Sequence, residues 1–294
     1  MITMKIWGGL GNQLFEYAFG YALAKRSGKE LILDMDFFSD DANRKPLILD
    51  CAIEERSIKG HAKYDSQISS FQKSRLSRLK LKIFSKIGIG RFRYTRELGP
   101  FFSNSYMNGP LKDYNYFDGY WQCEKYFLDY ADDLRRQFVP QVVSEKVREF
   151  SNELRNCDSV SLHIRRGDYT AFPLHPTPSQ SMYLLDFKYY INAIKKLEET
   201  FPDSVIYCFS DDIPWCKEML SDFTIRYVDR SNQFSDLEEF YLMSRCKNHI
   251  IANSTYSWWA AWLNSDKDKT VICPDRWFGN QNIFPESWLK INRE

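Results

Sequence analysis

The stretch Ser161-Leu-His-Ile-Arg-Arg-Gly-Asp-Tyr169 decides how the second half of this chain is interpreted. Val160, Leu162 and Ile164 alternate with polar residues, which is typical of a half-buried β-strand. Two arginines, a glycine and an aspartate follow at the carboxyl end of that strand, where open α/β sheets bind ligands. Two guanidinium groups suit a diphosphate, because each can donate a bidentate pair of hydrogen bonds. A surface Arg-Asp pair at the end of a strand is the alternative.

Strands and helices alternate on both sides of this stretch. In the first half we predict a glycine turn over 8–11, strands over 3–7, 30–34 and 116–122, and helices over 12–26, 124–138 and 144–155. In the second half we predict strands over 159–165, 205–209, 249–252 and 270–273, and helices over 186–200, 212–220, 236–246 and 256–264. This alternation predicts an α/β fold with parallel, Rossmann-like sheets. We expect two domains, 1–150 and 151–294, with their boundary near Pro140.

Composition narrows the class of protein. With 294 residues, 44% hydrophobic and 27% charged, the chain has the make-up of a globular protein with a sizeable core. A net charge of +1 gives no overall field that points to nucleic acid. The seven cysteines lack CxxC spacing, which indicates reduced thiols in a cytosolic protein and no zinc site. No apolar run approaches the ~20 residues of a membrane span, and we identify no signal peptide.

Two further strand ends carry polar residues. Ser210-Asp211-Asp212 follows a predicted strand, and its carboxylates suit ribose hydroxyls or a guanine edge, with a helix N-cap as the alternative. Asn253-Ser254-Thr255 lies between a strand and a helix. The N–H groups at the start of that helix can bind a phosphate.

Two other features have a less specific interpretation. Asp34-Met-Asp36 has the DxD pattern of a metal site, but it lies far in sequence from the arginine cluster, so we expect a structural role and no metal. Residues 71–96 contain nine Lys or Arg and no acid, with Leu76, Leu79 and Ile83 on one helical face. This basic segment is either a solvated helix or a contact with anionic lipid.

Four motifs occur in an order that resembles a known family. They are Gly8-Gly-Leu-Gly-Asn-Gln-Leu-Phe15, His163-Ile-Arg-Arg-Gly-Asp-Tyr169, Ser210-Asp-Asp212 and Asn253-Ser-Thr-Tyr-Ser-Trp-Trp259. Together with Gly119-Tyr-Trp-Gln122, which leads into Glu124-Lys-Tyr-Phe127, they resemble the α-1,2-fucosyltransferases of glycosyltransferase family 11. The resemblance runs over nearly the whole chain.

The resemblance implies a GT-B-like architecture, in which two Rossmann-like domains face a cleft. It implies an acceptor-side domain over 1–150 and a GDP-sugar-binding domain over 151–294. It also implies that L-fucose moves from GDP-β-L-fucose to the 2-hydroxyl of a galactoside, with inversion and without a metal or other cofactor. The acceptor glycan stays open, and a lipid-linked oligosaccharide is one possibility.

The same resemblance assigns roles to residues. Arg165 holds the donor diphosphate, with support from Arg166 and Asp168, and Asn12 lies near the acceptor and the reacting sugar. The remaining donor-binding candidates are His163, Ser210, Asp211, Asp212, Asn253, Ser254, Thr255 and Ser257, and the remaining acceptor-side candidates are Gly11, Gln13 and Glu16. Glu16 stands where the family commonly has Gln, so its contact with the acceptor is in question.

Arginine and N–H donors stabilise the charge that develops on the departing diphosphate. Asp168, Glu16 and His175 are candidates for a general base, and the sequence does not choose among them. The alternatives to this activity are a non-catalytic protein that binds a sugar or nucleotide sugar, and another GDP-sugar-dependent transferase.

Overall fold

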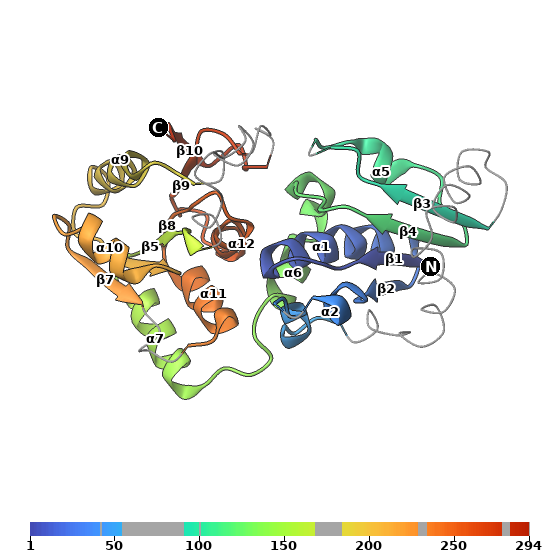
Figure 1. The fold of residues 1–294 in the computed structure, drawn as a ribbon, viewed down its shortest axis with the longest axis horizontal. Coiled ribbons are helices and arrows are strands. Elements are labelled where there is room, and N and C mark those ends of the chain that lie inside the picture. The colour runs from blue at the N-terminus through green and yellow to red at the C-terminus, as the bar shows by residue number, and fades with distance from the viewer. Residues whose placement is uncertain are drawn as a thin grey trace. The chain divides into compact units, whose positions relative to one another are not determined.

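The computed structural model describes residues 1–41, 43–54, 91–99, 101–167, 184–228, 234–277 and 283–293. The chain divides into two compact units, Met1–Val139 and Pro140–Glu294 (Figure 1). The predicted division after residue 150 lies inside helix α7 (Glu145–Asn156), which belongs to the second unit.

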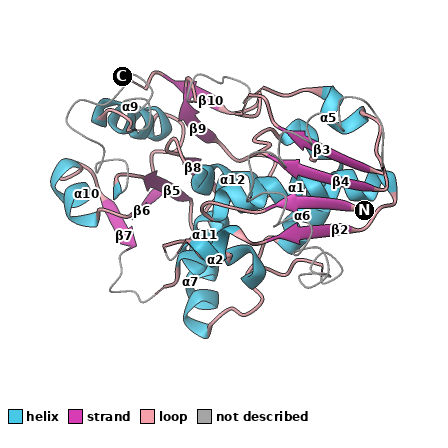
Figure 2. Ribbon diagram, turned by 45° about the vertical axis from the view of Figure 1, so that its right-hand side comes forward, coloured by secondary structure: helices cyan, strands magenta, loops and turns pink. Residues whose placement is uncertain are grey.

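The first unit is built on a four-stranded parallel sheet in the order β2-β1-β4-β3 (Figure 2). Its strands are β1 (Ile2–Lys5), β2 (Leu31–Asp34), β3 (Phe92–Arg96) and β4 (Tyr114–Asp118). Its helices are α1 (Leu10–Ser27), α2 (Phe37–Asp40), α5 (Asn104–Asn108) and α6 (Ala131–Gln137), with 3-10 turns η1 (Leu47–Asp50), η3 (Glu124–Tyr126) and η4 (Leu128–Tyr130).

Helix α1 forms the centre of the core of the first unit. Most of its side chains are buried, and it ends at Gly28, whose left-handed φ of 63° forms a glycine C-cap. A Cβ at Gly20 would lie only 2.3 Å from the Met4 side chain, so glycine lets the helix approach β1 closely. The Phe19 ring stacks on Trp121 at 4.1 Å, which ties the helix to the segment that follows β4.

The second unit contains a six-stranded parallel sheet in the order β10-β9-β8-β5-β6-β7 (Figure 2). Its strands are β5 (Ser159–Ile164), β6 (Val205–Ser210), β7 (Ile225–Val228), β8 (Asn248–Ile250), β9 (Val271–Pro274) and β10 (Leu289–Ile291). Its helices after α7 are α9 (Phe187–Glu198), α10 (Ile213–Met219), α11 (Asp236–Arg245) and α12 (Thr255–Leu263).

The strand order of the second unit is that of a Rossmann fold. Strand β5 comes first in the unit and lies in the middle, with β6 and β7 on one side and β8, β9 and β10 on the other. The order therefore reverses between β5 and β8, and ligands of such sheets bind outside the carboxyl ends of the strands at this switch point. The predicted α/β fold with two Rossmann-like sheets is confirmed.

The structure also corrects parts of the sequence interpretation. The helix predicted over 124–138 is broken into η3, η4 and α6, because the buried Phe127 has a non-helical ψ of 6° and packs against Phe15. The strands that the sequence did not predict, β3, β7 and β10, all lie at sheet edges. Edge strands often carry charges, which obscure the apolar pattern.

The basic segment 71–96 falls mostly outside the described residues. Its final residues form strand β3, so the helical interpretation is wrong there. Arg91 pairs with Asp113 at 2.5 Å, and Arg93 donates a hydrogen bond to the Pro110 carbonyl at 2.6 Å. A membrane contact of the remaining residues stays a prediction. Within the described ranges, no helix has both the length and the apolar character that crossing a membrane requires.

Candidate active site

The three polar strand ends of the second unit lie on adjacent strands. Ile164 at the end of β5 pairs with Ser210 at the end of β6, and Leu162 of β5 pairs with Ile250 of β8. Because all three strands are parallel, the segments that follow them emerge at the same edge of the sheet. The structure thus brings the predicted donor-binding motifs together at the switch point.

Arg165 is held by the loop that follows β6. Its Nη1 lies 2.9 Å from Asp211 Oδ2, and Asp211 Oδ1 accepts a hydrogen bond from the Arg166 backbone N at 2.8 Å. A Cβ at Gly167 would lie 2.5 Å from Asp211 Oδ2, so a larger residue there would require the Asp211 carboxylate to shift. One carboxylate therefore orients both the guanidinium group and the backbone of the arginine motif.

Arg166 is fixed by an equivalent set of contacts. Its Nε donates to Asp212 Oδ2 at 3.0 Å, and its guanidinium lies 3.9 Å from the centre of the Trp215 ring. Asp212 also caps α10, because its Oδ1 accepts from the Trp215 backbone N at 3.2 Å. The predicted N-cap role of Asp212 and its place in the cluster are thus compatible. Ser210 supports the same turn, since its Oγ accepts from Asp212 N at 3.0 Å.

His163 lies near the end of β5 as a neutral imidazole. It is only 5% exposed, and its ring centre lies 5.7 Å from that of Tyr256. Burial, followed by the positive charge of Arg165, lowers the pKa of His163 to about 3. Its Nδ1 has no hydrogen-bond partner among the described residues. His163 therefore shapes the site by packing and contributes no positive charge to it.

The third motif forms the start of helix α12. Ser254 occupies the N-cap position, but its side chain makes no capping hydrogen bond. Ser257 Oγ donates to the Ser254 carbonyl at 3.2 Å, and Asn253 and Ser257 are buried. These two side chains support the loop. The N-terminal N–H groups of α12, which include that of Thr255, are the part suited to an anion.

The glycine motif of the first unit is organised by Gln13. This buried side chain donates from Nε2 to the Gly8 carbonyl at 2.9 Å and to the Lys45 carbonyl at 2.8 Å, and its Oε1 accepts from Ile48 N at 3.0 Å. Gln13 therefore fixes the turn rather than facing solvent. Gly11 lies buried in the first turn of α1.

Asn12 is held by the segment after β4. Its Oδ1 accepts from Gln122 Nε2 at 3.1 Å, and a Cβ at Gly8 would lie 3.0 Å from its Nδ2. Gly8 has a φ of 75°, which favours glycine in any case. The glycine turn thus brings Asn12 against the loop that contains Gln122.

Glu16 is fully buried under the glycine turn, where its Oε2 accepts from Trp7 N at 2.9 Å. Burial raises the pKa of this carboxyl well above its usual value, so the protonated form is favoured. A buried, protonated carboxyl cannot serve as a general base for a solvent-exposed hydroxyl. The other two candidate bases, Asp168 and His175, lie outside the described residues.

The Asp34/Asp36 pair is engaged in local hydrogen bonds. Asp34 Oδ2 accepts from the Tyr116 hydroxyl at 2.5 Å, and Asp34 Oδ1 accepts from Asp36 N at 3.1 Å. Among the residues that the structure describes, no group of three or more His, Cys, Asp or Glu could hold a metal ion. The structural role predicted for Asp34 agrees with these contacts.

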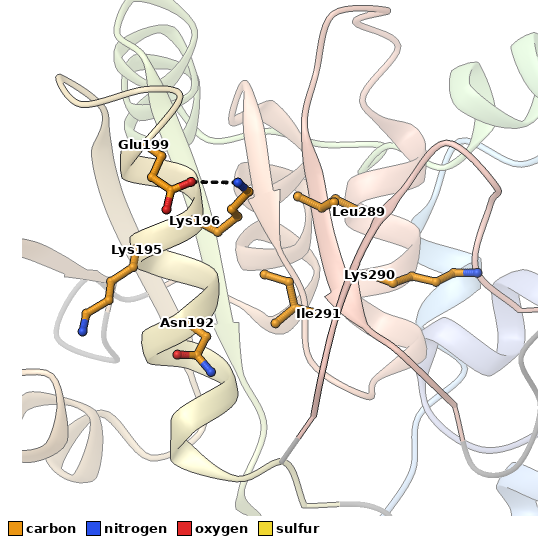
Figure 3. A pocket seen from close by; sticks show the side chains of 7 residues that line it. All are labelled: Asn192, Lys195, Lys196, Glu199, Leu289, Lys290 and Ile291. Carbon is orange, nitrogen blue, oxygen red and sulfur yellow. Dashed lines mark hydrogen bonds and ion pairs between the residues drawn. The ribbon is translucent and has the colours of Figure 1, made fainter.

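A separate cavity of about 410 Å³ lies between α9 and the edge strand β10 (Figure 3). Lys196 pairs with Glu199 at 2.7 Å, while Lys195 and Lys290 extend away from each other. The described residues that line this cavity include none of the predicted site residues: they are Asn192, Lys195, Lys196, Glu199, Leu289, Lys290 and Ile291. The cavity is therefore distinct from the arginine cluster.

The two parallel α/β units define a protein of the GT-B-like class, and the arginine cluster lies where such sheets bind ligands. The sequence profile of Glycosyl transferase family 11 matches residues 1–292. The chain belongs to glycosyl transferase family 11 and is a glycosyltransferase, as the motif resemblance predicted.

Curated relatives share this assignment. The chain is 31% identical to an Alpha-1,2-colitosyltransferase of Escherichia coli, over 100% of this chain and 99% of the relative. It is 32% identical to the O-antigen biosynthesis glycosyltransferase WbnK of Escherichia coli, over 97% and 98%. It is 23% identical to the Galactoside alpha-(1,2)-fucosyltransferase 2 of Gorilla gorilla gorilla, over 90% and 69%.

Solved structures show the same fold at low sequence identity. Arabidopsis thaliana FUT1 in complex with GDP matches with a TM-score of 0.56 at 13% identity, over 92% of this chain and 69% of that one. The fucosyltransferase NodZ from Bradyrhizobium matches with a TM-score of 0.51 at 14% identity, over 88% and 91%.

Proposed function

We propose that this chain transfers L-fucose from GDP-β-L-fucose to the 2-hydroxyl of a terminal galactoside, with inversion at the anomeric carbon. The observation that carries the proposal is the pair of arginines at the switch point, each oriented by an aspartate of the neighbouring strand end. Family membership and a galactoside α-1,2-fucosyltransferase among the relatives support the choice of donor and acceptor.

The arginines account for the leaving group. As the bond between fucose C1 and the diphosphate breaks, the diphosphate gains negative charge, which preorganised donors stabilise. The Arg165 side chain is 31% exposed, and a guanidinium group carries five N–H donors in a fixed planar arrangement. The first-turn N–H groups of α12 supply further donors to the same diphosphate. This set provides positive charge without a metal, so we propose that no metal or other cofactor is needed.

The acceptor side relies on positioning. The attacking galactoside hydroxyl approaches the face of fucose opposite the diphosphate, which converts a β-linked donor into an α-linked product. Asn12, whose Oδ1 is held by Gln122, orients that hydroxyl in this proposal. A general base assists by taking the hydroxyl proton, and Asp168 is the remaining candidate within the arginine motif.

Transfer of colitose is the second candidate, because a relative named as a colitosyltransferase matches all of this chain at 31% identity. The experiment that separates the two measures release of GDP from GDP-fucose and from the GDP-linked colitose donor, with lactose as acceptor. We expect GDP-fucose to be used with the higher kcat/KM and NMR of the product to show an α-1,2 linkage. Activity should survive excess EDTA. A strong preference for the colitose donor, or no acceptor-dependent GDP release, would contradict the proposal.

The native acceptor is proposed to be a glycan precursor carried on a lipid at an anionic membrane, which the residues of the basic segment 71–96 that precede β3 would contact. Each basic residue near such a surface contributes about 1 kcal/mol, screened by salt. Replacing Lys73, Lys80, Lys82 and Lys86 by Gln should weaken binding to anionic vesicles and leave transfer to lactose nearly intact. Equal binding of the wild-type chain to neutral and anionic vesicles would contradict this proposal.

A further inference from the structure

The first unit contains a cavity of about 330 Å³ at the carboxyl ends of its strands. Lys5 and Trp7 reach it from the end of β1, Glu97 from the end of β3, and Asp118 and Tyr120 from the end of β4. The strand order of this sheet changes direction between β1 and β4, so the cavity lies at the switch point of its own sheet. Its volume falls at the lower end of ligand pockets, which span about 300–1,000 Å³.

The walls of this cavity are held in place by contacts that do not depend on a ligand. The Trp7 and Tyr120 rings stack with their centres 4.3 Å apart and 14° between their planes. Glu97 accepts hydrogen bonds from the backbone N of Tyr120 at 2.8 Å and of Trp121 at 3.1 Å. Trp121 is buried with a positive φ of 55°, an unusual conformation that its packing maintains. The aromatic pair is therefore preorganised.

The polar groups of the cavity are also oriented. Asp118 accepts from Lys5 Nζ at 3.3 Å and from the Tyr94 hydroxyl at 2.7 Å. Lys5 Nζ in turn lies 4.8 Å from the centre of the Trp7 ring. Both side chains are partly exposed, at 28% for Lys5 and 19% for Asp118, so they remain within reach of a ligand.

The chemistry of this lining suits an uncharged sugar. Its formal charges balance, because Lys5 and Arg96 are matched by Glu97 and Asp118. Hydroxyl groups both donate and accept hydrogen bonds, so they can satisfy carboxylates and cations at once. Because these charges balance, the lining offers a phosphate or carboxylate ligand no net electrostatic attraction. The aromatic pair adds an apolar surface, against which the C–H face of a pyranose can pack.

We propose that this cavity is the subsite that binds a neutral pyranose of the acceptor glycan. The inference rests on the proposed function, since it names where the acceptor of that reaction is held. Gln122 lines the cavity and also donates to Asn12 Oδ1. This contact joins the subsite to the residue proposed to orient the reacting hydroxyl.

The first test measures binding without any transfer. Saturation-transfer NMR is recorded with methyl β-D-galactopyranoside and with the anionic methyl β-D-galacturonoside. We expect a signal for the neutral sugar that Asp118→Asn and Tyr120→Ala each reduce at least about fivefold, and a weaker signal for the anionic one. Asp113→Asn is the matched control, because Asp113 precedes the same strand, pairs with Arg91 on the surface and does not line the cavity. Thermal melting checks that each variant is folded.

The second test separates this subsite from the proposed activity. With GDP-fucose and lactose, Asp118→Asn and Tyr120→Ala should raise the acceptor KM about tenfold or more, as the loss of a charged hydrogen bond or a packed ring predicts. The donor KM and GDP binding should stay within about twofold of wild type, as they should in Asp113→Asn. An unchanged acceptor KM in both folded variants overturns the subsite while the transferase proposal stands. If the wild type does not use GDP-fucose, the proposed function fails, and the NMR signal alone decides the subsite.

Discussion

At the scale of single residues, the two arginines of the motif are not equivalent. Arg166 lies against the Trp215 ring and pairs with the capping carboxylate Asp212, which gives it a mainly positioning role. Arg165 pairs with Asp211, and its side chain is 31% exposed, against 20% for that of Arg166. We therefore expect Arg165 to stabilise the negative charge that develops on the departing diphosphate.

Replacing Arg165 by Ala should lower kcat by roughly 100- to 1,000-fold, which corresponds to ~2.7–4 kcal/mol for one lost charge-stabilising donor. Arg165→Lys should restore only part of the activity, because an ammonium group cannot form a bidentate pair of hydrogen bonds. Steady-state kinetics at saturating GDP-fucose measure both effects. Arg155→Ala, at an exposed position of α7, is the control. Turnover near wild type in Arg165→Ala would exclude this role.

Glu16 gives a prediction about stability. Burial raises the pKa of Glu16 in the folded state, so the folded protein binds the carboxyl proton more tightly than the unfolded chain does. The contribution of Glu16 to the free energy of unfolding is therefore present in full below the unfolded-state pKa. It is lost as the pH rises from there through the folded-state pKa. Glu16→Gln should therefore raise the free energy of unfolding at neutral pH and flatten its decline between acidic and neutral pH.

Urea unfolding at several pH values measures this effect. Glu30→Gln, at an exposed position of the same unit, is the matched control and should leave the curve unchanged. A destabilised Glu16→Gln variant at neutral pH would show that the buried carboxylate is charged and compensated.

At the scale of elements, two helices of the second unit begin in different ways. Helix α11 begins with a capping box, in which Ser235 Oγ accepts from Glu238 N at 3.3 Å and Glu238 Oε2 accepts from Ser235 N at 2.9 Å. Helix α12 has Ser254 at its N-cap, and the Ser254 side chain makes no such capping hydrogen bond. The first helix end is closed by its own side chains, whereas the N–H groups at the start of the second are the ones suited to an anion.

Replacing the serine at each of these two helix starts by alanine should have opposite effects on stability and on GDP binding. Ser235→Ala should cost about 1 kcal/mol of stability, which lowers Tm by about 2–4 °C, and should leave GDP affinity unchanged. Ser254→Ala should change the Tm of the GDP-free protein little and should weaken GDP binding. Scanning fluorimetry with and without GDP measures both variants, each serving as the control for the other. A reversed pattern would remove α12 from the donor site.

The elements also show where sequence periodicity is informative. Helices α7, α9, α11 and α12 begin and end within two residues of their predicted bounds, because each has caps or an apolar face within its own sequence. The broken stretch 124–138 was predicted as one helix, since the break depends on where Phe127 packs in the core. Local pattern does not contain that information.

At the scale of the whole molecule, each unit presents its own set of polar strand ends. The arginine, aspartate and serine motifs belong to the second unit, and the glycine motif belongs to the first. We therefore predict that GDP alone protects 163–167, 210–212 and 253–257 from amide hydrogen exchange, with little change at 8–13. Arg165→Ala serves as the control that should lose this protection. Protection confined to 8–13 would exchange the proposed donor and acceptor units.

The sequence by itself determined the class of this protein, because glycine turns, strand-end arginines and helix-starting serines are local signals in a recognisable order. It did not determine which strands are neighbours, and only the pairing of β5 with β6 and β8 brings Arg165 against Asp211 and places both beside the switch point.

The sequence also did not determine which polar side chains are buried. Glu16 follows the glycine motif in sequence, yet helix packing closes it off from solvent. Lys5, Glu97 and Asp118 are distant in sequence, and they meet in one cavity because the parallel pairing of β1, β4 and β3 aligns the carboxyl ends of these strands. Pairing and burial arise from contacts between distant segments, which no local pattern encodes.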